Sequence, residues 1–257
     1  MEIGVTQSEP QGSRVFRAAG LAAALAFRVI PVGFRFKIAI IVARSIEPLI
    51  ARSRAYADRA QFRTDGLRET SLELLLMMLS RHGTVFHPTL HIDGLDHVPS
   101  ASHGGTLIVG PHTMLTRLFV RYLEDAGIET WVIDSANPDQ RIPGTRAAAH
   151  VLLPSAMFFF KVRRLLADGK TVISMIDRGE PESRASSVET GAGRVFVSYP
   201  LLQLALRQRA TVVFVAASID EWSRVVIRLS VPASESGALP DTLGDFVMFM
   251  NEAKRGA

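Results

Sequence analysis

The stretch "TLIVGPHTMLTR", residues 106–117, decides the fold class. Its short apolar start predicts a buried β-strand, and the apolar spacing over residues 113–126 predicts an amphipathic helix. His112 lies at the junction between the two, and Arg117 follows five residues later. The sequence therefore predicts a strand-to-helix unit with a histidine between its elements.

Strand and helix patterns alternate along the rest of the chain. Strands are predicted at 105–110, 130–134, 171–176, 211–217 and 224–231, helices at 113–126, 156–168, 195–208 and 241–253, and a polar loop at 178–193. Strands joined by crossover helices pair in parallel. We therefore expect an α/β fold with a mixed, largely parallel sheet flanked by helices.

The N-terminal part differs in composition from the rest. The run "AAGLAAALAF", residues 18–27, is bounded by Arg17 and Arg28, and it is too short to cross a bilayer, which takes ~20 residues. Pro31 interrupts the apolar stretch that follows. Two helices meeting near Pro31, lying in the headgroup region with arginines reaching toward water, fit this pattern.

A buried helical hairpin that packs on the main domain is the alternative for this segment. A signal peptide fits less well, because Arg28, Arg35 and Lys37 follow the apolar run closely. We expect residues 1–54 to form a tail with membrane-associating helices, an N-terminal apolar anchor, and residues 55–257 to form the α/β domain.

The overall composition limits the chemistry. The 257 residues include no cysteine, which excludes disulfides, thiolate metal sites and cysteine nucleophiles. The histidines show no metal-ligand spacing, so no metal site is expected. A net charge of +4 suits an anionic lipid surface or an acidic carrier, although an arginine-rich composition also reflects codon usage. Nucleic acid is not expected, since no binding motif is present.

Candidate reactive residues follow two of the predicted strands. His112 follows the strand that ends near Gly110, and Asp177 follows the strand that ends at Ile176. In parallel sheets reactive groups gather outside the carboxyl ends of the strands, so we expect both at one edge. Helix or turn capping is the alternative role for each. The next residue, Arg178, suits bidentate phosphate binding.

Three segments carry a family resemblance: "IDGLDHVP" (92–99), "LIVGPH" (107–112) and "GAGRVFVSYPLLQLALRQRATVVFVAA" (191–217). With the apolar N-terminus, they make the chain resemble the lysophospholipid acyltransferase superfamily over roughly residues 15–250. Within it, the chain is similar to the bacterial lipid A biosynthesis (lauroyl/myristoyl-type) acyltransferases. The resemblance implies an enzyme peripheral or monotopic to the cytoplasmic face of the bacterial inner membrane.

The resemblance also implies a reaction. His112 would remove the proton from a hydroxyl of a glycolipid or phospholipid-like acceptor, which then attacks the thioester of an acyl carrier protein or coenzyme A adduct. That thioester is a co-substrate, and no other cofactor is implied. Substrate-binding roles fall on the loop and arginine positions Arg117, Arg178, Gly179, Gly193 and Arg194, the last two at the start of a helix.

The family places an aspartate or glutamate where this chain has Arg117. A guanidinium only donates hydrogen bonds, so it cannot orient the imidazole as a carboxylate does. Asp177 is the candidate replacement and Asp134 a second one, whereas Glu124 lies ~18 Å along the helix. A lipid-binding protein that kept this fold but lost the chemistry is therefore the alternative function.

Overall fold

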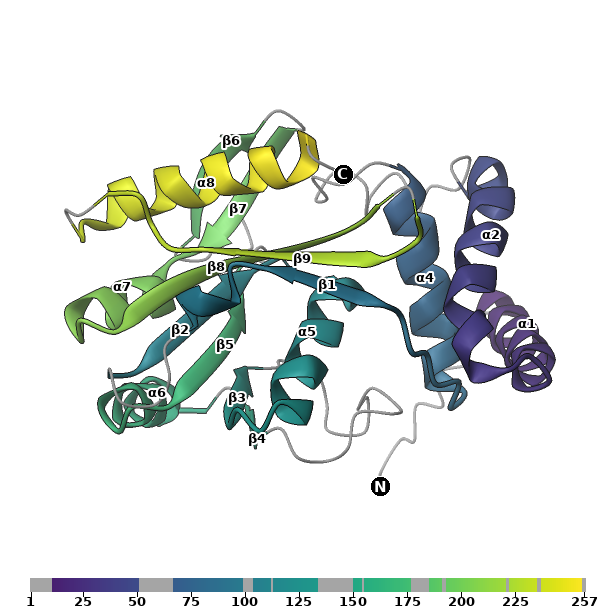
Figure 1. The fold of residues 1–257 in the computed structure, drawn as a ribbon, viewed down its shortest axis with the longest axis horizontal. Helices are drawn as coiled ribbons and strands as arrows, with labels where there is room; N and C mark the ends of the chain where they lie inside the picture. Colours follow the sequence, from purple (N-terminus) through teal and green to yellow (C-terminus); the bar gives the residue numbers. More distant parts are fainter. Residues whose placement is uncertain are drawn as a thin grey trace, which may run out of the picture.

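The computed structural model describes ten segments of the chain: residues 11–50, 67–98, 104–111, 113–133, 150–153, 155–176, 185–190, 193–220, 222–234 and 237–255. The main sheet lies between two layers of helices (Figure 1). Its strand order is β1 (Leu90–Asp93), β9 (Val225–Ser230), β8 (Thr211–Ile219), β2 (Thr106–Gly110), β5 (Thr171–Met175), β3 (Thr130–Ile133) and β4 (His150–Leu152).

The strand pairing confirms the expected sheet type. Strands β8, β2, β5, β3 and β4 run parallel to one another. Strand β9 returns antiparallel beside β8, and β1 pairs parallel to β9. The result is a mixed, largely parallel sheet, in which β8 to β9 is a direct hairpin because only five residues connect the two strands.

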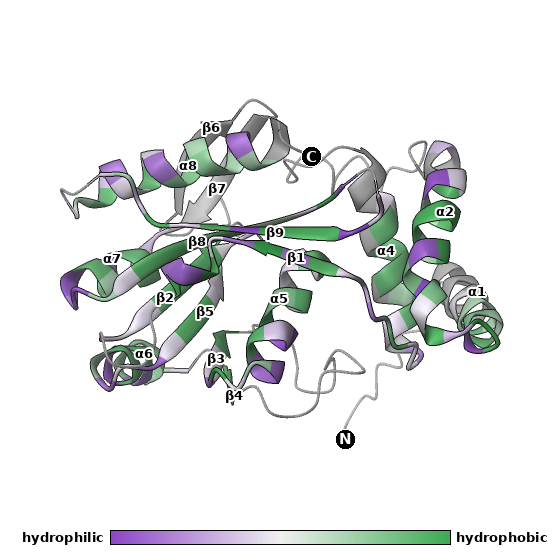
Figure 2. Cartoon of the chain, in the orientation of Figure 1, coloured by the Kyte–Doolittle hydropathy of each residue, from purple (hydrophilic) through white to green (hydrophobic). Residues whose placement is uncertain are grey.

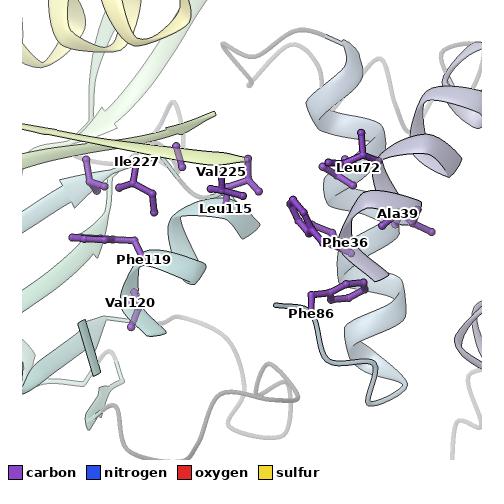
Figure 3. Packing of buried hydrophobic residues seen from close by; sticks show 14 of the residues in the cluster. Phe36, Ala39, Leu72, Phe86, Leu115, Phe119, Val120, Val225 and Ile227 are labelled. Carbon is purple, nitrogen blue, oxygen red and sulfur yellow. The ribbon is translucent and has the colours of Figure 1, made fainter. Parts of the chain in front are cut away.

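Alternating strand residues build two cores. Leu107 and Val109 of β2 belong to one cluster, and Ile108 between them belongs to the other, as the period of two in a strand requires. The first cluster includes α6 (Phe158–Ala167), α7 (Pro200–Arg207) and α8 (Leu239–Arg255). The second includes α5 (Met114–Asp125), α1 (Gln11–Arg28), α2 (Val32–Ile50) and α4 (Leu67–Arg81). Figure 3 shows Leu115 and Phe119 of α5 directed at β9, and Phe36 and Phe86 beside α4.

The two N-terminal helices meet at Pro31, as the sequence predicts. The Arg35 guanidinium fixes this corner, because it donates hydrogen bonds to the carbonyls of Ile30 at 2.9 Å and Arg28 at 3.2 Å. It also donates to Val85 at 3.4 Å. Of the helices that the structure describes, none has the length and apolar character to cross a membrane.

The fold departs from the sequence predictions at the expected loop over 178–193 and the expected helix over 195–208. An antiparallel hairpin of β6 (Ala185–Thr190) and β7 (Gly193–Ser198) occupies part of both, and α7 begins only at Pro200. The segment "RVFVS" alternates β-branched and other residues, which favours a strand over a helix. Strand β4 was not predicted, since three residues are too few to show a period.

Candidate functional site

The carboxyl ends of β2 and β5 lie side by side. Gly110 pairs with Met175 in parallel register, and the Ile176 amide donates a hydrogen bond to the Gly110 carbonyl at 3.1 Å. His112 and Asp177, each two residues beyond a member of this pair, lie outside the described residues. Positions 112 and 177 therefore follow the carboxyl ends of two neighbouring strands, at one edge of the sheet.

Asp134, the second candidate acid, directly follows β3, which pairs with β5 on the side away from β2. Asp134 also lies outside the described residues. The chain positions that follow β5 and β3 are therefore one and two strands away from β2, respectively.

Gly110 brings the strand end close to β8. A Cβ atom at this position would lie 2.6 Å from the Val215 carbonyl oxygen and 2.5 Å from its Cγ1. Any larger residue must push the two strands apart, since real Cβ contacts are longer than this. The glycine in "LIVGPH" therefore fixes where the central strand ends.

A buried threonine pair holds the chain just after the motif. Thr113 is the N-cap of α5, and its Oγ1 accepts a hydrogen bond from the Thr116 amide at 3.1 Å. The two hydroxyls are 2.8 Å apart, and the side chains are 4% and 0% exposed. The Thr113 amide also donates to the Pro111 carbonyl at 2.9 Å. The residues that flank His112 are thus tied to each other and to α5.

Thr113 and Thr116 are not among the site residues predicted from the sequence. The available signal was a threonine immediately before a helical apolar pattern, which is a standard N-terminal cap. The N-terminal end of α5 points its unpaired amides and positive dipole end toward the carboxyl edge of the sheet. This polarity suits an anionic group or a developing negative charge near the motif.

Helix α5 also carries Arg117 and Glu124. Arg117 lies one turn after the cap, and its side chain is outside what the structure describes. Glu124 is in the last turn, ~16 Å from Thr113 along the axis, so it does not replace the missing acid. Burial, together with the neighbouring Asp125 charge, raises the pKa of Glu124, and its Oε1 has no hydrogen-bond partner.

The remaining predicted substrate-binding residues divide into two groups. Arg178 and Gly179 lie outside the described residues. Gly193 and Arg194 belong to β7, where they pair with Thr190 and Glu189 across the β6–β7 hairpin. The expectation that they begin a helix is wrong, because six residues separate Gly193 from Pro200. Arg194 is therefore not at a helix N-terminus, so the predicted contribution of a helix dipole to anion binding does not apply to it.

The part of the chain that the structure describes contains no cluster of three or more histidine, aspartate or glutamate side chains suited to a metal ion. His150 and His91 each lie near a single carboxylate. His150 Nε2 is 3.5 Å from Glu129 and His91 Nε2 is 2.9 Å from Asp93. Both histidines are about half exposed.

No family model and no curated protein matches the chain. Among solved structures, the chain is similar to the crystal structure of the 1-acyl-sn-glycerophosphate (LPA) acyltransferase, PlsC, from Thermotoga maritima. The two chains share 12% identity over 95% of each, with a TM-score of 0.43.

Proposed function

We propose that this chain is an O-acyltransferase that moves a fatty acyl group from a thioester donor to a hydroxyl of a glycolipid or phospholipid-like acceptor. The observation that carries the proposal is the position of the "GPH" motif. It follows the central strand β2, directly precedes the buried cap of α5, and adjoins the end of β5. The donor is an acyl carrier protein or coenzyme A thioester, and no other cofactor is proposed.

In the proposed reaction His112 is the general base. Its imidazole takes the proton of the acceptor hydroxyl as the oxygen attacks the thioester carbonyl, because an alcohol is a weak nucleophile until its proton is removed. The tetrahedral intermediate expels the donor thiolate, which receives the proton from the imidazolium. An ester bond forms and the thioester bond breaks, with no change in oxidation state.

The imidazolium needs a hydrogen-bond acceptor on its second ring nitrogen. We assign this role to Asp177, since β5 lies next to β2 and their ends are in register. Arg117 and Arg178 would bind the acceptor's phosphate or another anionic group, with Gly179 in the same loop. Gly193 and Arg194 lie in β7 and not at a helix N-terminus. In this proposal they therefore contact the acceptor from the β6–β7 hairpin.

The proposed site of action is the cytoplasmic face of the bacterial inner membrane, with residues 1–54 as the membrane-associating part. The outer side of α1 supports this, because Leu21 and Leu25 are 50% and 51% exposed, and Val29, directly after the helix, is 85% exposed. The spacing of four puts Leu21 and Leu25 on one stripe of the helix. An apolar stripe with flanking arginines is typical of a helix that lies in the headgroup region.

The decisive experiment compares two histidine variants of the full-length protein in mixed detergent–phospholipid micelles. With acyl carrier protein and coenzyme A thioesters supplied in turn, His112→Ala should lower acyl transfer by ~10²–10⁴-fold. His87→Ala is the matched control, since His87 is exposed in the loop before β1. Activity of His112→Ala at the level of His87→Ala would contradict the proposal.

A lipid-binding protein without acyl transfer is the second candidate, and the observation that favours it is arginine at position 117. A positive charge near the imidazole opposes the imidazolium that catalysis needs. Arg117→Glu separates the two candidates. A gain in acyl transfer supports the binding protein, whereas a loss of transfer shows that the arginine takes part in the proposed reaction.

A further inference from the structure

The β8–β9 hairpin extends well past the carboxyl edge of the sheet. Val109 of β2 pairs with Phe214, so the end of β2 at Gly110 is level with Val215. Strand β8 continues four residues further, to Ile219, which is about 13 Å at the usual rise per residue. The hairpin tip therefore projects beyond the edge at which His112 follows β2 (Figure 1).

The tip is a tightly bonded turn. Asp220 accepts hydrogen bonds from the Arg224 amide at 2.8 Å and from its Nε at 2.6 Å. The Asp220 amide donates to the Arg224 carbonyl at 3.0 Å, and the Ser223 amide donates to the Asp220 carbonyl at 3.1 Å. Asp220 and Arg224 also form an ion pair, and Glu221 adds one negative charge to the sequence of the turn.

Trp222 sits in this turn with 69% of its surface exposed. The other tryptophan, Trp131, is half-buried and stacked on His150 with ring centroids 4.2 Å apart. A tryptophan at the tip of a rigid turn loses little conformational freedom when it is buried by a partner. The turn therefore presents a preformed aromatic contact.

The end of the hairpin beside the turn is held in place by the core, because Val225 pairs there with Ile219. Val225, where β9 starts, is fully buried and belongs to the same hydrophobic cluster as Phe36 of α2 and Leu72 of α4 (Figure 3). The projecting strands and the N-terminal helices are thus parts of one packed unit. A surface that binds α1 and α2 also fixes the position of the hairpin.

The surroundings favour a lipid bilayer as the occupant. Residues 11–46 contain no aspartate or glutamate, while Arg28, Lys37 and Arg44 are exposed among the apolar side chains of α1 and α2. Apolar area whose charges over residues 11–46 are positive complements an anionic phospholipid surface, although α2 also contains Glu47. Tryptophan is the residue most typical of the membrane–water interface, because its ring is apolar and its N–H stays hydrated.

We propose that Trp222 is an interfacial anchor that inserts into the headgroup region of an anionic phospholipid bilayer. Together with α1, it makes a two-point contact that holds the carboxyl edge of the sheet at the membrane surface. The inference deepens the proposed function, since it explains how the edge carrying His112 reaches a lipid acceptor. Binding itself is measurable without any acyl transfer.

The test uses Trp222 as its own reporter. In a Trp131→Phe variant of the full chain, Trp222 is the sole tryptophan, and vesicles of phosphatidylcholine with phosphatidylglycerol serve as the probe. The proposal expects a blue-shifted emission on vesicle addition and quenching by lipids brominated on their acyl chains. If Trp131→Phe does not fold, the difference between wild-type and Trp222→Ala spectra gives the same information.

Binding strength supplies the second measurement. Trp222→Ala should bind the same vesicles about tenfold more weakly, the effect of losing one half-inserted aromatic side chain. Trp222→Phe should recover part of the loss. Met248→Ala is the control, because Met248 is 55% exposed on α8 at the opposite face, and it should bind like the wild type.

Two outcomes overturn the anchor. One is equal vesicle binding by Trp222→Ala and Met248→Ala, and the other is a Trp222 emission shift that appears only when an acyl carrier protein is added, which indicates a protein partner. Neither depends on catalysis. Vesicle quenching of Trp222 without acyl transfer contradicts the proposed function alone, whereas acyl transfer without quenching contradicts the anchor alone.

Discussion

Helices α1 and α8 have nearly equal lengths, 18 and 17 residues, and lie on opposite sides of the sheet. Each buries apolar residues on its inner side, for example Phe27 in α1 and Phe246 in α8. On the outer side they differ: α8 exposes Asp241 and Glu252, and Figure 2 shows hydrophilic residues recurring along it. In α1, among the side chains that the structure describes, the exposed ones before Arg28 are apolar, with Leu21 and Leu25 about half exposed.

This difference shows that the two helices meet different surroundings. The inner side of a helix reflects the core, whereas its outer side reflects the medium it contacts. An apolar stripe on α1 costs solubility unless another apolar phase covers it. If that phase is a membrane, negative charge on the outer side of α1 should weaken lipid binding, whereas negative charge on α8 should not.

The largest effect is expected from charging the outer stripe of α1. Leu21→Glu combined with Leu25→Glu should weaken binding to anionic vesicles by roughly 100-fold or more, because two half-exposed leucines lose insertion and two negative charges are added. Co-sedimentation with phosphatidylglycerol vesicles measures the change.

The matched change on α8 is Met248→Glu, which should leave vesicle binding close to wild type. Circular dichroism checks that both variants keep their helical content. If Met248→Glu weakens binding as much as the α1 variant, the two sides of the molecule are equivalent, and the comparison of α1 with α8 fails.

A smaller effect is expected at the carboxylate of α8. The Ser234 amide and hydroxyl donate to Asp245 Oδ2 at 2.9 and 2.8 Å, and these bonds lower the pKa of Asp245 below 3.8. Asp245→Asn should therefore destabilise the protein by ~1 kcal/mol at pH 7.

The sign of the pH dependence follows from the lowered pKa. The stabilisation is complete above the unfolded pKa of 3.8 and is lost as the pH falls through the lower folded value. Urea unfolding at pH 7 and at a pH below the lowered folded pKa measures it, with the two proteins converging at the lower pH. A pH-independent difference would mean that the carboxylate charge plays no part.

Long, strongly periodic elements were predictable from sequence, and short or context-dependent ones were not. The parallel pairing of β2 with β5 follows from strand and helix alternation, and the Pro31 corner follows from the proline itself. By contrast, Val195 and Val197 lie in a strand because β6 pairs with β7. The short alternation in "RVFVS" favours a strand, but it is outweighed by the helical spacing of the longer window over 195–208, and the pairing that decides between the two is tertiary information.

The candidate site shows the same division. The position of "GPH" at a strand end was predictable from the pattern in residues 106–117. The depth to which Thr113 and Thr116 are buried was not, because burial depends on what packs over the cap. The projection of Trp222 was also unpredictable, since it depends on the register between β2 and β8.

Two glycines, Gly20 in α1 and Gly244 in α8, allow the packing of the two helices to be compared. Gly244 in α8 has open space where a Cβ would lie, whereas a Cβ at Gly20 in α1 would meet His82 Nε2 at 2.9 Å and Met78 Cγ at 3.0 Å. Gly244→Ala should stabilise the protein by ~0.5–1 kcal/mol through helix propensity. Gly20→Ala should gain less or lose stability, because side chains of α4 and the turn after it must move.

Thermal unfolding distinguishes the two glycine variants. Gly244→Ala should raise the midpoint by roughly 1–4 °C in a protein of this size, and Gly20→Ala should fall below it. Equal gains in both variants would indicate that α1 does not pack closely on α4 at this point.

The smallest effect is expected at Glu124, which lies in α5 on the same side of the sheet as α1. Burial and the adjacent Asp125 raise the pKa of Glu124 above 4.5, opposite in direction to Asp245. Ionised Glu124 therefore opposes folding at pH 7, and the penalty decreases as the pH falls through the raised pKa. Glu124→Gln should give a small gain in the free energy of unfolding at pH 7 that disappears below pH 4.5. Because the glutamine keeps the shape of the side chain, a gain that persists at low pH points to packing rather than to charge.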